Sequence, residues 1–197
     1  FPMIRLVDFN NYARRMLYAG RTIRQILSEA YDDADLDQYW IADGFNCNAR
    51  RRALFPDYKK NRQHEPGDSI FDALDFMKSN LKHTNAVFIE VPGYEADDVI
   101  AHLTNAFSAE GERVHIDSND LDLYALSALP GVTITRTSEV PPEDIRLYKT
   151  LVGDPSDNIP GLPSLGPKTF LKNNWTGLCE SLKNLSETPN VSGLPDR

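Results

Sequence analysis

The 197-residue sequence is poor in the residues that usually build disulfide, zinc and nucleophile sites. Its two cysteines, Cys47 and Cys179, lie far apart, and neither has a second thiol at the spacing of a metal-binding pair. This pattern argues against a disulfide scaffold and predicts free thiols in a reducing compartment. The four histidines share no spacing, so neither a zinc site nor a Ser-His-Asp triad is indicated; they are His64, His83, His102 and His115.

Long apolar runs are also missing, so no membrane-spanning segment is predicted, and the start of the chain shows no secretory signal pattern. Neither the Gly-x4-Gly-Lys-Ser/Thr loop nor Gly-x-Gly-x-x-Gly occurs, so nucleotide binding of those kinds is unsupported. Asp and Glu outnumber Lys and Arg by 29 to 21, and the formal charge of −8 at first disfavours a nucleic-acid partner.

Short apolar runs alternate with segments of helical periodicity. The expected strands cover residues 4–7, 38–42, 86–89, 114–116 and 132–135. The expected helices cover about 12–27, about 70–81, and the acidic run at 93–101 extended to about 109. This alternation predicts an α/β fold with a mostly parallel sheet flanked by helices, whereas residues 46–62 are expected to be irregular. Gly, Pro, Asn and Lys replace strand formers after about Tyr148, so a boundary is placed there.

Acidic residues recur where the predicted strands end or the next helix begins; they are Asp8, Asp43, Glu95, Asp97, Asp98, Asp120 and Asp122. Single acids suit turns and helix N-termini, so each alone has a structural explanation. The carboxyl ends of parallel strands, however, lie along one edge of a sheet, where ligands bind. Because four separate segments bring carboxylates to this edge, we favour a binding site there.

Clustered carboxylates repel one another unless cations lie between them. Oxygen ligands without nearby His or Cys favour Mg²⁺ or Mn²⁺ over zinc. Two such ions roughly 3.5–4 Å apart can stabilise both the attacking and the leaving oxygen in phosphodiester cleavage. The acidic edge therefore predicts a two-metal site.

Cationic and aromatic side chains are interleaved over residues 50–62. Their Arg and Lys side chains can bind phosphates, while Tyr58 or Phe55 offers a stacking surface to an unpaired base. A solvated loop is the alternative reading of such a charge run. The segment directly follows Asp43, which places it above the proposed metal site and favours the functional reading.

A Gly- and Pro-rich motif covers residues 153–169. Its Gly161-x-Pro163-x-x-Gly166-x-Lys168 part can form a tight turn whose backbone N–H groups bind a phosphate, with added charge from Lys168. Asp154 and Asp157 lie three residues apart and can face the metal edge. With these two, nine of the 29 acids are candidate ligands or their supports, which leaves 20 against 21 basic residues. The negative balance is therefore compatible with a metal-charged site beside a phosphate-binding surface.

Taken in order, these motifs resemble the structure-specific 5′ nuclease superfamily, which includes flap endonucleases and the 5′→3′ exonucleases of phages and bacterial polymerases. The shared segments are Asp8, Asp43-Gly44, Pro56-x-Tyr58-Lys59-x-x-Arg62, Glu95-Ala96-Asp97-Asp98, Ser118-x-Asp120-x-Asp122 and Gly153-Asp154 through Lys168. The resemblance covers nearly the whole chain and fits a compact phage or bacterial member. It implies a PIN-like nuclease core over residues 1–148 and a helix–three-turn–helix DNA-binding region over 149–197.

The resemblance also assigns roles to individual residues. A first metal position would be surrounded by Asp8, Asp43, Glu95, Asp97 and Asp120. A second would use Asp122, Asp154 and Asp157, with Asp98 bridging or supporting through water. Lys59 and Arg62 would engage the scissile phosphate, Tyr58 would stack, and Arg15 would contact phosphate. The duplex backbone would be gripped, in relatives often through a bound K⁺, by Gly161, Gly166, Lys168 and Thr169.

The implied activity is divalent-metal-dependent hydrolysis of DNA phosphodiesters near 5′ ends and single-strand/double-strand junctions, by a monomer in the cytoplasm of a bacterium or phage-infected cell. The short interval between Asp43 and Glu95 leaves little chain for a long helical arch, so an open clamp is as plausible as a closed one. Three alternatives stay open: a PIN-type ribonuclease, a non-catalytic DNA-junction-binding module, and an α/β domain whose acids are solvated turn residues.

Overall fold

A five-stranded parallel sheet forms the centre of the molecule, with strand order β3-β2-β1-β4-β5. The computed structural model describes residues 3–31, 37–61, 69–173 and 175. The strands are β1 (Ile4–Asp8), β2 (Asp37–Ala42), β3 (Val87–Glu90), β4 (Val114–Asp117) and β5 (Val132–Ile134). The predicted α/β class and all five predicted strands are confirmed. Because every strand runs in the same direction, all the carboxyl ends point to one edge.

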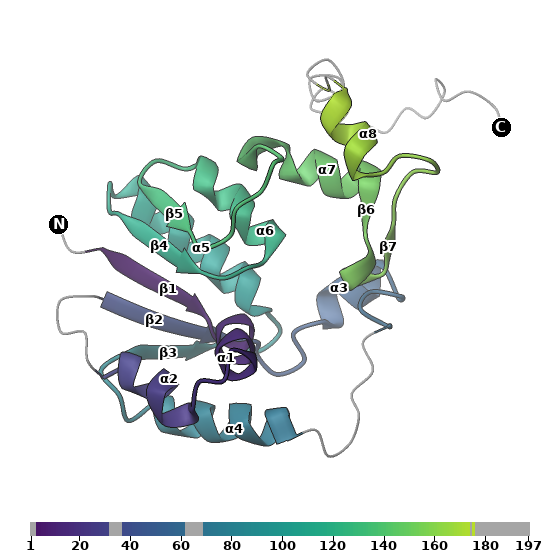
Figure 1. Cartoon of the computed structure of the whole chain (residues 1–197). Helices are drawn as coiled ribbons and strands as arrows, with labels where there is room; N and C mark the ends of the chain where they lie inside the picture. Colours follow the sequence, from purple (N-terminus) through teal and green to yellow (C-terminus); the bar gives the residue numbers. More distant parts are fainter. Residues whose placement is uncertain (1–2, 32–36, 62–68, 174, 176–197) are drawn as a thin grey trace.

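Helices cover both faces of this sheet (Figure 1). The helices on one face are α1 (Phe9–Tyr18), α2 (Ile23–Glu29) and α4 (Ser69–Leu81). Those on the other face are α5 (Ala96–Ala109) and α6 (Leu121–Tyr124). The spacing of Leu74, Met77 and Leu81 places all three on one side of α4, where they are buried against the sheet. The apolar periodicity of residues 70–81 thus correctly predicts which side of α4 packs against the sheet.

The single helix predicted over residues 12–27 is instead two helices. Gly20, with φ +82°, turns the chain after α1 in a conformation that residues with a side chain rarely adopt. Thr22 then caps α2, since its hydroxyl accepts the Gln25 N–H and the Gln25 side chain accepts the Thr22 N–H. The interval expected to be irregular also contains a short helix, α3 (Ala49–Leu54). Apolar periodicity alone revealed neither the break between α1 and α2 nor the short helix α3.

A second, smaller unit follows the sheet. This unit begins after β5, which is itself preceded by the 3-10 turn η1 (Ala125–Ala128). It contains the 3-10 turn η2 (Pro142–Asp144), α7 (Ile145–Val152), the antiparallel hairpin of β6 (Gly153–Asp154) and β7 (Ile159–Pro160) with the 3-10 turn η3 (Pro155–Asp157) between them, and α8 (Pro167–Lys172). Its own apolar cluster centres on Ile145, Leu151 and Phe170. The hairpin lies beside α3 in Figure 1. The helix–three-turn–helix element and the boundary at residue 148 stay predictions, because most of the chain beyond α8 lies outside the described residues.

Within the described ranges, no helix is both long and apolar enough to cross a membrane.

Candidate active site

Four carboxylates lie close enough at the carboxyl edge of the sheet to interact electrostatically, and they are called the first acidic group here; they are Asp8, Asp43, Asp97 and Asp120. Asp8 ends β1 and Asp43 follows β2. Asp97 lies in the first turn of α5, and Asp120 caps α6. The parallel topology therefore brings together carboxylates from four segments, as the pattern of acids at strand ends predicts.

Electrostatic repulsion within the first acidic group appears in the pKa values. Burial raises the pKa of Asp8, which is 6% exposed, to about 6; hydrogen bonds from Ser118 and Asn11 oppose the rise, and the charges of Asp43 and Asp120 add to it. Burial also raises the pKa of Asp97 well above its usual value, and the charges of Asp8 and Asp120 raise it further. Such a group binds a divalent cation favourably because the cation relieves this repulsion.

Hydrogen bonds fix these carboxylates from outside the group. The Ser118 hydroxyl donates to Asp8 Oδ2 at 2.8 Å and accepts the Asp120 N–H at 3.1 Å, so it joins β1 to the turn after β4. Asp43 Oδ1 accepts the Ala96 N–H at 2.9 Å, while its Oδ2 accepts from the Asn10 amide at 3.1 Å. Asp43 thereby ties the end of β2 to the N-terminus of α5.

A second acidic group consists of Asp122, Asp154 and Asp157, whose carboxylate oxygens lie within 4.8 Å of one another. The Lys149 ammonium lies 2.6 Å from oxygens of both Asp122 and Asp154. Gly153 and Gly161 bring the hairpin strands close, since a Cβ on Gly161 would lie 2.1 Å from the Val152 carbonyl oxygen. This close approach places Asp154 and Asp157 opposite Asp122.

Glu95 interacts with the basic segment and not only with other acids. It is 3% exposed, and its Oε1 accepts from the Lys59 ammonium at 2.6 Å. Its Oε2 accepts from the Tyr58 hydroxyl at 3.0 Å and lies 2.8 Å from Arg51 Nη1. The whole of Tyr58 is only 5% exposed, so its ring forms part of the protein interior here.

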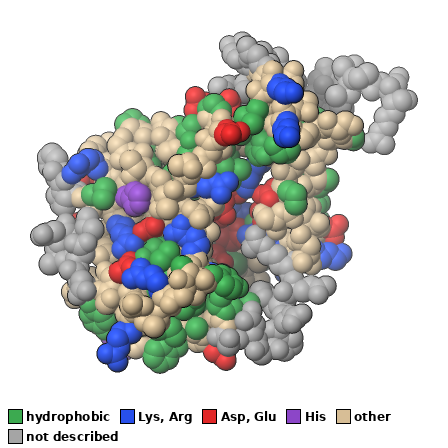
Figure 2. All heavy atoms as spheres, in the orientation of Figure 1, with side chains coloured by type: hydrophobic (Ala, Val, Ile, Leu, Met, Phe, Trp, Pro, Cys, Tyr) green, Lys and Arg blue, Asp and Glu red, His purple; other side chains and the backbone are tan. Residues whose placement is uncertain are grey.

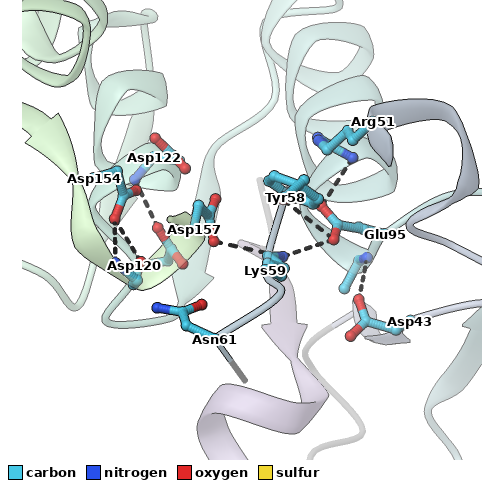
Figure 3. A network of polar contacts seen from close by, with 12 residues as sticks. Asp43, Arg51, Tyr58, Lys59, Asn61, Glu95, Asp120, Asp122, Asp154 and Asp157 are labelled. Carbon is cyan, nitrogen blue, oxygen red and sulfur yellow. Dashed lines mark hydrogen bonds and ion pairs between the residues drawn. The ribbon is translucent and has the colours of Figure 1, made fainter. Parts of the chain in front are cut away.

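Lys59 lies between Glu95, at the start of α5, and Asp157, in the β6–β7 hairpin (Figure 3). Its ammonium is 3.9 Å from Asp157 Oδ1, and its backbone N–H donates to the Asp157 carbonyl at 3.1 Å. The Asn61 amide donates to the Pro155 carbonyl at 2.9 Å, and the Asn158 amide donates to the Asp57 carbonyl at 3.0 Å. Residues 57–61 therefore bridge the sheet edge and the β6–β7 hairpin.

The second acidic group and Asp97 of the first line a cleft of about 820 Å³. Asp97, Asp122, Asp154 and Asp157 contribute to its charged wall. Its apolar wall comes from side chains of several elements, namely Leu54, Phe55, Ala101, Leu126 and Ile159. Figure 2 shows acidic atoms inside the hollow between the body of the molecule and the β6–β7 hairpin. A charged floor beside an apolar wall suits a substrate with both phosphates and bases.

Other predicted site residues lie at the margins. Asp98 faces Arg51, and Arg15 lies 3.6 Å from Asp117. Gly166 caps α8, whose first turn contains Lys168 and Thr169. Arg62 is outside the described residues.

Sequence reasoning gave no individual role to Lys149, Ser118 or Arg51. Ser118 is part of a motif quoted above, and Arg51 is one of three adjacent arginines. Lys149 lies in the last turn of α7, and no spacing in the sequence marks it as a partner of Asp122.

Comparisons with known proteins place this geometry in a family. The profile described as 5′-3′ exonuclease, N-terminal resolvase-like domain, matches residues 4–149. A 5′-3′ exonuclease of Aquifex aeolicus is 38% identical over 138 residues, which cover 64% of this chain and 47% of that protein. The thermostable DNA polymerase I of Thermus thermophilus is 37% identical over 149 residues, covering 68% of this chain and 18% of the polymerase. The chain thus spans less than half the length of both relatives.

Among solved structures, the T5 D15 protein co-crystallised with metal ions superposes with a TM-score of 0.71 at 21% identity, covering 99% of this chain and 80% of that one. The T5 D15 flap endonuclease in a pseudo-enzyme–product complex with DNA and metal ions gives a TM-score of 0.64 at 18% identity, covering 99% and 80%. These similarities show a shared fold. Together with the profile match over most of its length, they support one conclusion: the chain belongs to the family of 5′-3′ exonuclease N-terminal, resolvase-like domains.

Proposed function

We propose that this chain is a divalent-metal-dependent 5′→3′ exonuclease and 5′-flap endonuclease that hydrolyses DNA phosphodiesters near 5′ ends and single-strand/double-strand junctions. Family membership supports the proposal. The observation that carries it is that two acidic groups from separate segments lie beside one another, with Asp97 of the first group and all of the second lining one cleft.

The donor chemistry fits Mg²⁺ or Mn²⁺, since the acids offer only carboxylate oxygens. Asp8, Asp43, Asp97 and Asp120 would hold one ion, with Glu95 beside them, and Asp122, Asp154 and Asp157 would hold the other. When bound, the ions supply charge stabilisation to the attacking and leaving oxygens of the phosphodiester. Lys59, Lys149 and Arg51 form ion pairs with these carboxylates in the described structure.

The basic segment would orient the scissile phosphate. The Lys59 ammonium lies beside Glu95 and Asp157 and can donate a hydrogen bond to a phosphate oxygen that enters the cleft. Arg62 follows three residues later and would add a second charge. Because its hydroxyl donates to Glu95, we assign Tyr58 to fixing that carboxylate; stacking on a base would require its ring to become exposed.

The duplex would lie against the small C-terminal unit and α1. Arg15 would contact a phosphate, as would the turn that leads into α8, through Gly161, Gly166, Lys168 and Thr169, with K⁺ as a possible bound ion. These contacts position DNA without reading its sequence, which suits an enzyme that recognises junctions.

The direct test is cleavage of flap, nicked, gapped and single-stranded DNA, and of an RNA flap, in Mg²⁺. Wild-type protein should cleave the DNA flap, and Asp120→Asn should lose this activity. Asp72→Asn, at an exposed position of α4, should keep it. Undiminished cleavage by Asp120→Asn would refute the assignment. Cleavage of RNA alone would indicate a ribonuclease, and binding of flaps without cleavage would indicate a non-catalytic junction module.

A further inference from the structure

The three adjacent arginines of α3 make different contacts. Arg50 lies over the Tyr94 ring, with 4.9 Å from its guanidinium carbon to the ring centre. Exposed Arg52 donates a long hydrogen bond of 3.4 Å to the Tyr58 carbonyl. Arg51, in contrast, turns inward and forms ion pairs with Glu95 and Asp98 of the acidic run. A basic run that looks uniform in sequence therefore contains one residue with a distinct environment.

The Arg51 guanidinium binds Asp98 as a fork. Nη1 lies 2.8 Å from Asp98 Oδ2 and Nη2 lies 2.9 Å from Asp98 Oδ1, while Nη1 is also 2.8 Å from Glu95 Oε2. Two-point pairs of this kind restrict orientation as well as distance, and a lysine cannot reproduce them. Burial tends to raise the pKa of Asp98, but the hydrogen bonds and charge of Arg51 outweigh it and lower that pKa.

Asp98 is in turn fixed to the start of α5, because its Oδ2 accepts the Glu95 N–H at 3.1 Å. The fork therefore attaches α3 to the helix terminus that presents the acidic run. Glu95 receives Arg51, Tyr58 and Lys59 on its two oxygens. Arg51 belongs to α3, and Tyr58 and Lys59 belong to the bridge at residues 57–61, so all three donors come from residues 49–61.

Lys59 needs such support. Its φ of +52° is uncommon for a residue with a side chain, so the surrounding contacts must maintain that backbone conformation. On one side its N–H donates to the Asp157 carbonyl. On the other side the Arg51 fork anchors the preceding helix to α5.

We propose that Arg51 is a positioning residue, which fixes α3 to the N-terminus of α5 through Asp98 and Glu95 and thereby keeps the Lys59 ammonium over the acidic groups. Arg51 does not act as a phosphate contact, because Asp98 binds both of its terminal nitrogens. The Lys59 ammonium has three N–H donors and one short contact, to Glu95, so it can still donate to a phosphate. The catalytic part of this inference rests on the proposed function, whereas the structural part does not.

Arg51→Gln removes both the charge and the two-point fork, and Arg52→Gln is the matched control one residue away. Hydrogen exchange of the metal-free, DNA-free protein tests the structural part. Amides of residues 49–61 should exchange about tenfold faster in Arg51→Gln, because charge-assisted hydrogen bonds are lost. The same amides should keep wild-type rates in Arg52→Gln. Unchanged exchange in Arg51→Gln would overturn the proposal whether or not the protein cleaves DNA.

Two further measurements separate positioning from phosphate binding. In Ca²⁺, flap affinity of Arg51→Gln should stay within about threefold of wild type, with an unchanged salt slope; loss of a phosphate contact would instead reduce the slope by about 0.9. In Mg²⁺, its single-turnover cleavage should fall at least about tenfold, and Arg51→Lys should recover only part of this loss. A reduced salt slope with normal cleavage, or full recovery by Arg51→Lys, would contradict the positioning role.

Discussion

Lys59 Nζ lies 2.6 Å from Glu95 Oε1, so the basic segment and the acidic helix are in direct contact at the centre of the cleft. Both residues are largely buried, with side-chain exposures of 13% and 4%. The effective dielectric constant around the pair is therefore lower than that of water. Removing the charge of one partner should for this reason strongly change the electrostatic energy of the other.

Replacing Lys59 by Met should separate metal binding from cleavage. Loss of the ammonium makes the cleft more negative, so Mn²⁺ should bind more tightly in calorimetry. Cleavage of a DNA flap should nevertheless fall about a hundredfold, because the donor proposed for the phosphate is gone. Lys60→Met is the control, since exposed Lys60 pairs only with Asp57 among the described residues. Weaker Mn²⁺ binding by Lys59→Met would contradict this electrostatic account.

The raised pKa of Asp8 predicts how the metal-free protein responds to pH. The folded state binds this proton more tightly than the unfolded chain, so the contribution of Asp8 to stability is largest below its ordinary pKa of 3.8 and is lost as pH rises through about 6. The loss is on the order of 2–3 kcal/mol. In EDTA, urea unfolding should therefore show Asp8→Asn gaining stability relative to wild type between pH 5 and pH 8.

Magnesium should reverse this order at pH 8. It should raise the unfolding midpoint of wild type by binding the folded state, and it should have a smaller effect on Asp8→Asn. If the stability difference between Asp8→Asn and wild type in EDTA were the same at pH 5 and pH 8, the pKa of Asp8 would not be raised in the folded protein.

Asp154→Asn should remove one of the two proposed Mn²⁺ equivalents. Asp154 belongs to the second acidic group, so the site formed with Asp122 and Asp157 loses a charged ligand while the first group is unchanged. Calorimetric titration with Mn²⁺ measures the stoichiometry. Asp72→Asn serves as the control on α4, and unchanged stoichiometry in Asp154→Asn would exclude Asp154 as a ligand.

Gly161→Ala should destabilise the protein by about 1–3 kcal/mol, as overpacking does. The added Cβ would lie 2.1 Å from the Val152 carbonyl oxygen and 2.8 Å from the Gly153 nitrogen. Gly166→Ala is a close control, because a Cβ there meets nothing within 4 Å. Urea unfolding measures the free energy of unfolding of both variants. Equal values would show that the hairpin can shift to accommodate the added Cβ without loss of stability.

The sequence was a good guide to the sheet and its acidic edge because both follow from local rules. Apolar runs mark buried strands, and parallel strands necessarily end on the same side, so Asp8, Asp43 and Asp120 could be placed together without coordinates. The break at Gly20 was missed because apolar periodicity continues across it; the glycine and the Thr22 cap were the available signals.

The ion pairs between side chains on opposite sides of the cleft could not be predicted from the sequence. Whether Glu95 faces other acids or Lys59, and whether Lys149 reaches Asp122, depends on how the β6–β7 hairpin docks on the sheet. Spacing along the chain contains no information on that docking. The same is true of Arg51, whose neighbours in sequence carry the same charge but point elsewhere.

Asp154 and Asp157 of the second acidic group belong to the unit whose apolar cluster surrounds Ile145 and Phe170, whereas the first acidic group lies at the edge of the sheet, which has its own apolar clusters. Regions supported by fewer buried side chains open at lower free energy than the rest of a protein. Mild heat or low urea should therefore release the hairpin as a partial unfolding event while the sheet stays intact. Such a form would keep most of its circular dichroism yet have lost half of its metal-binding capacity, so inactivation should precede global melting.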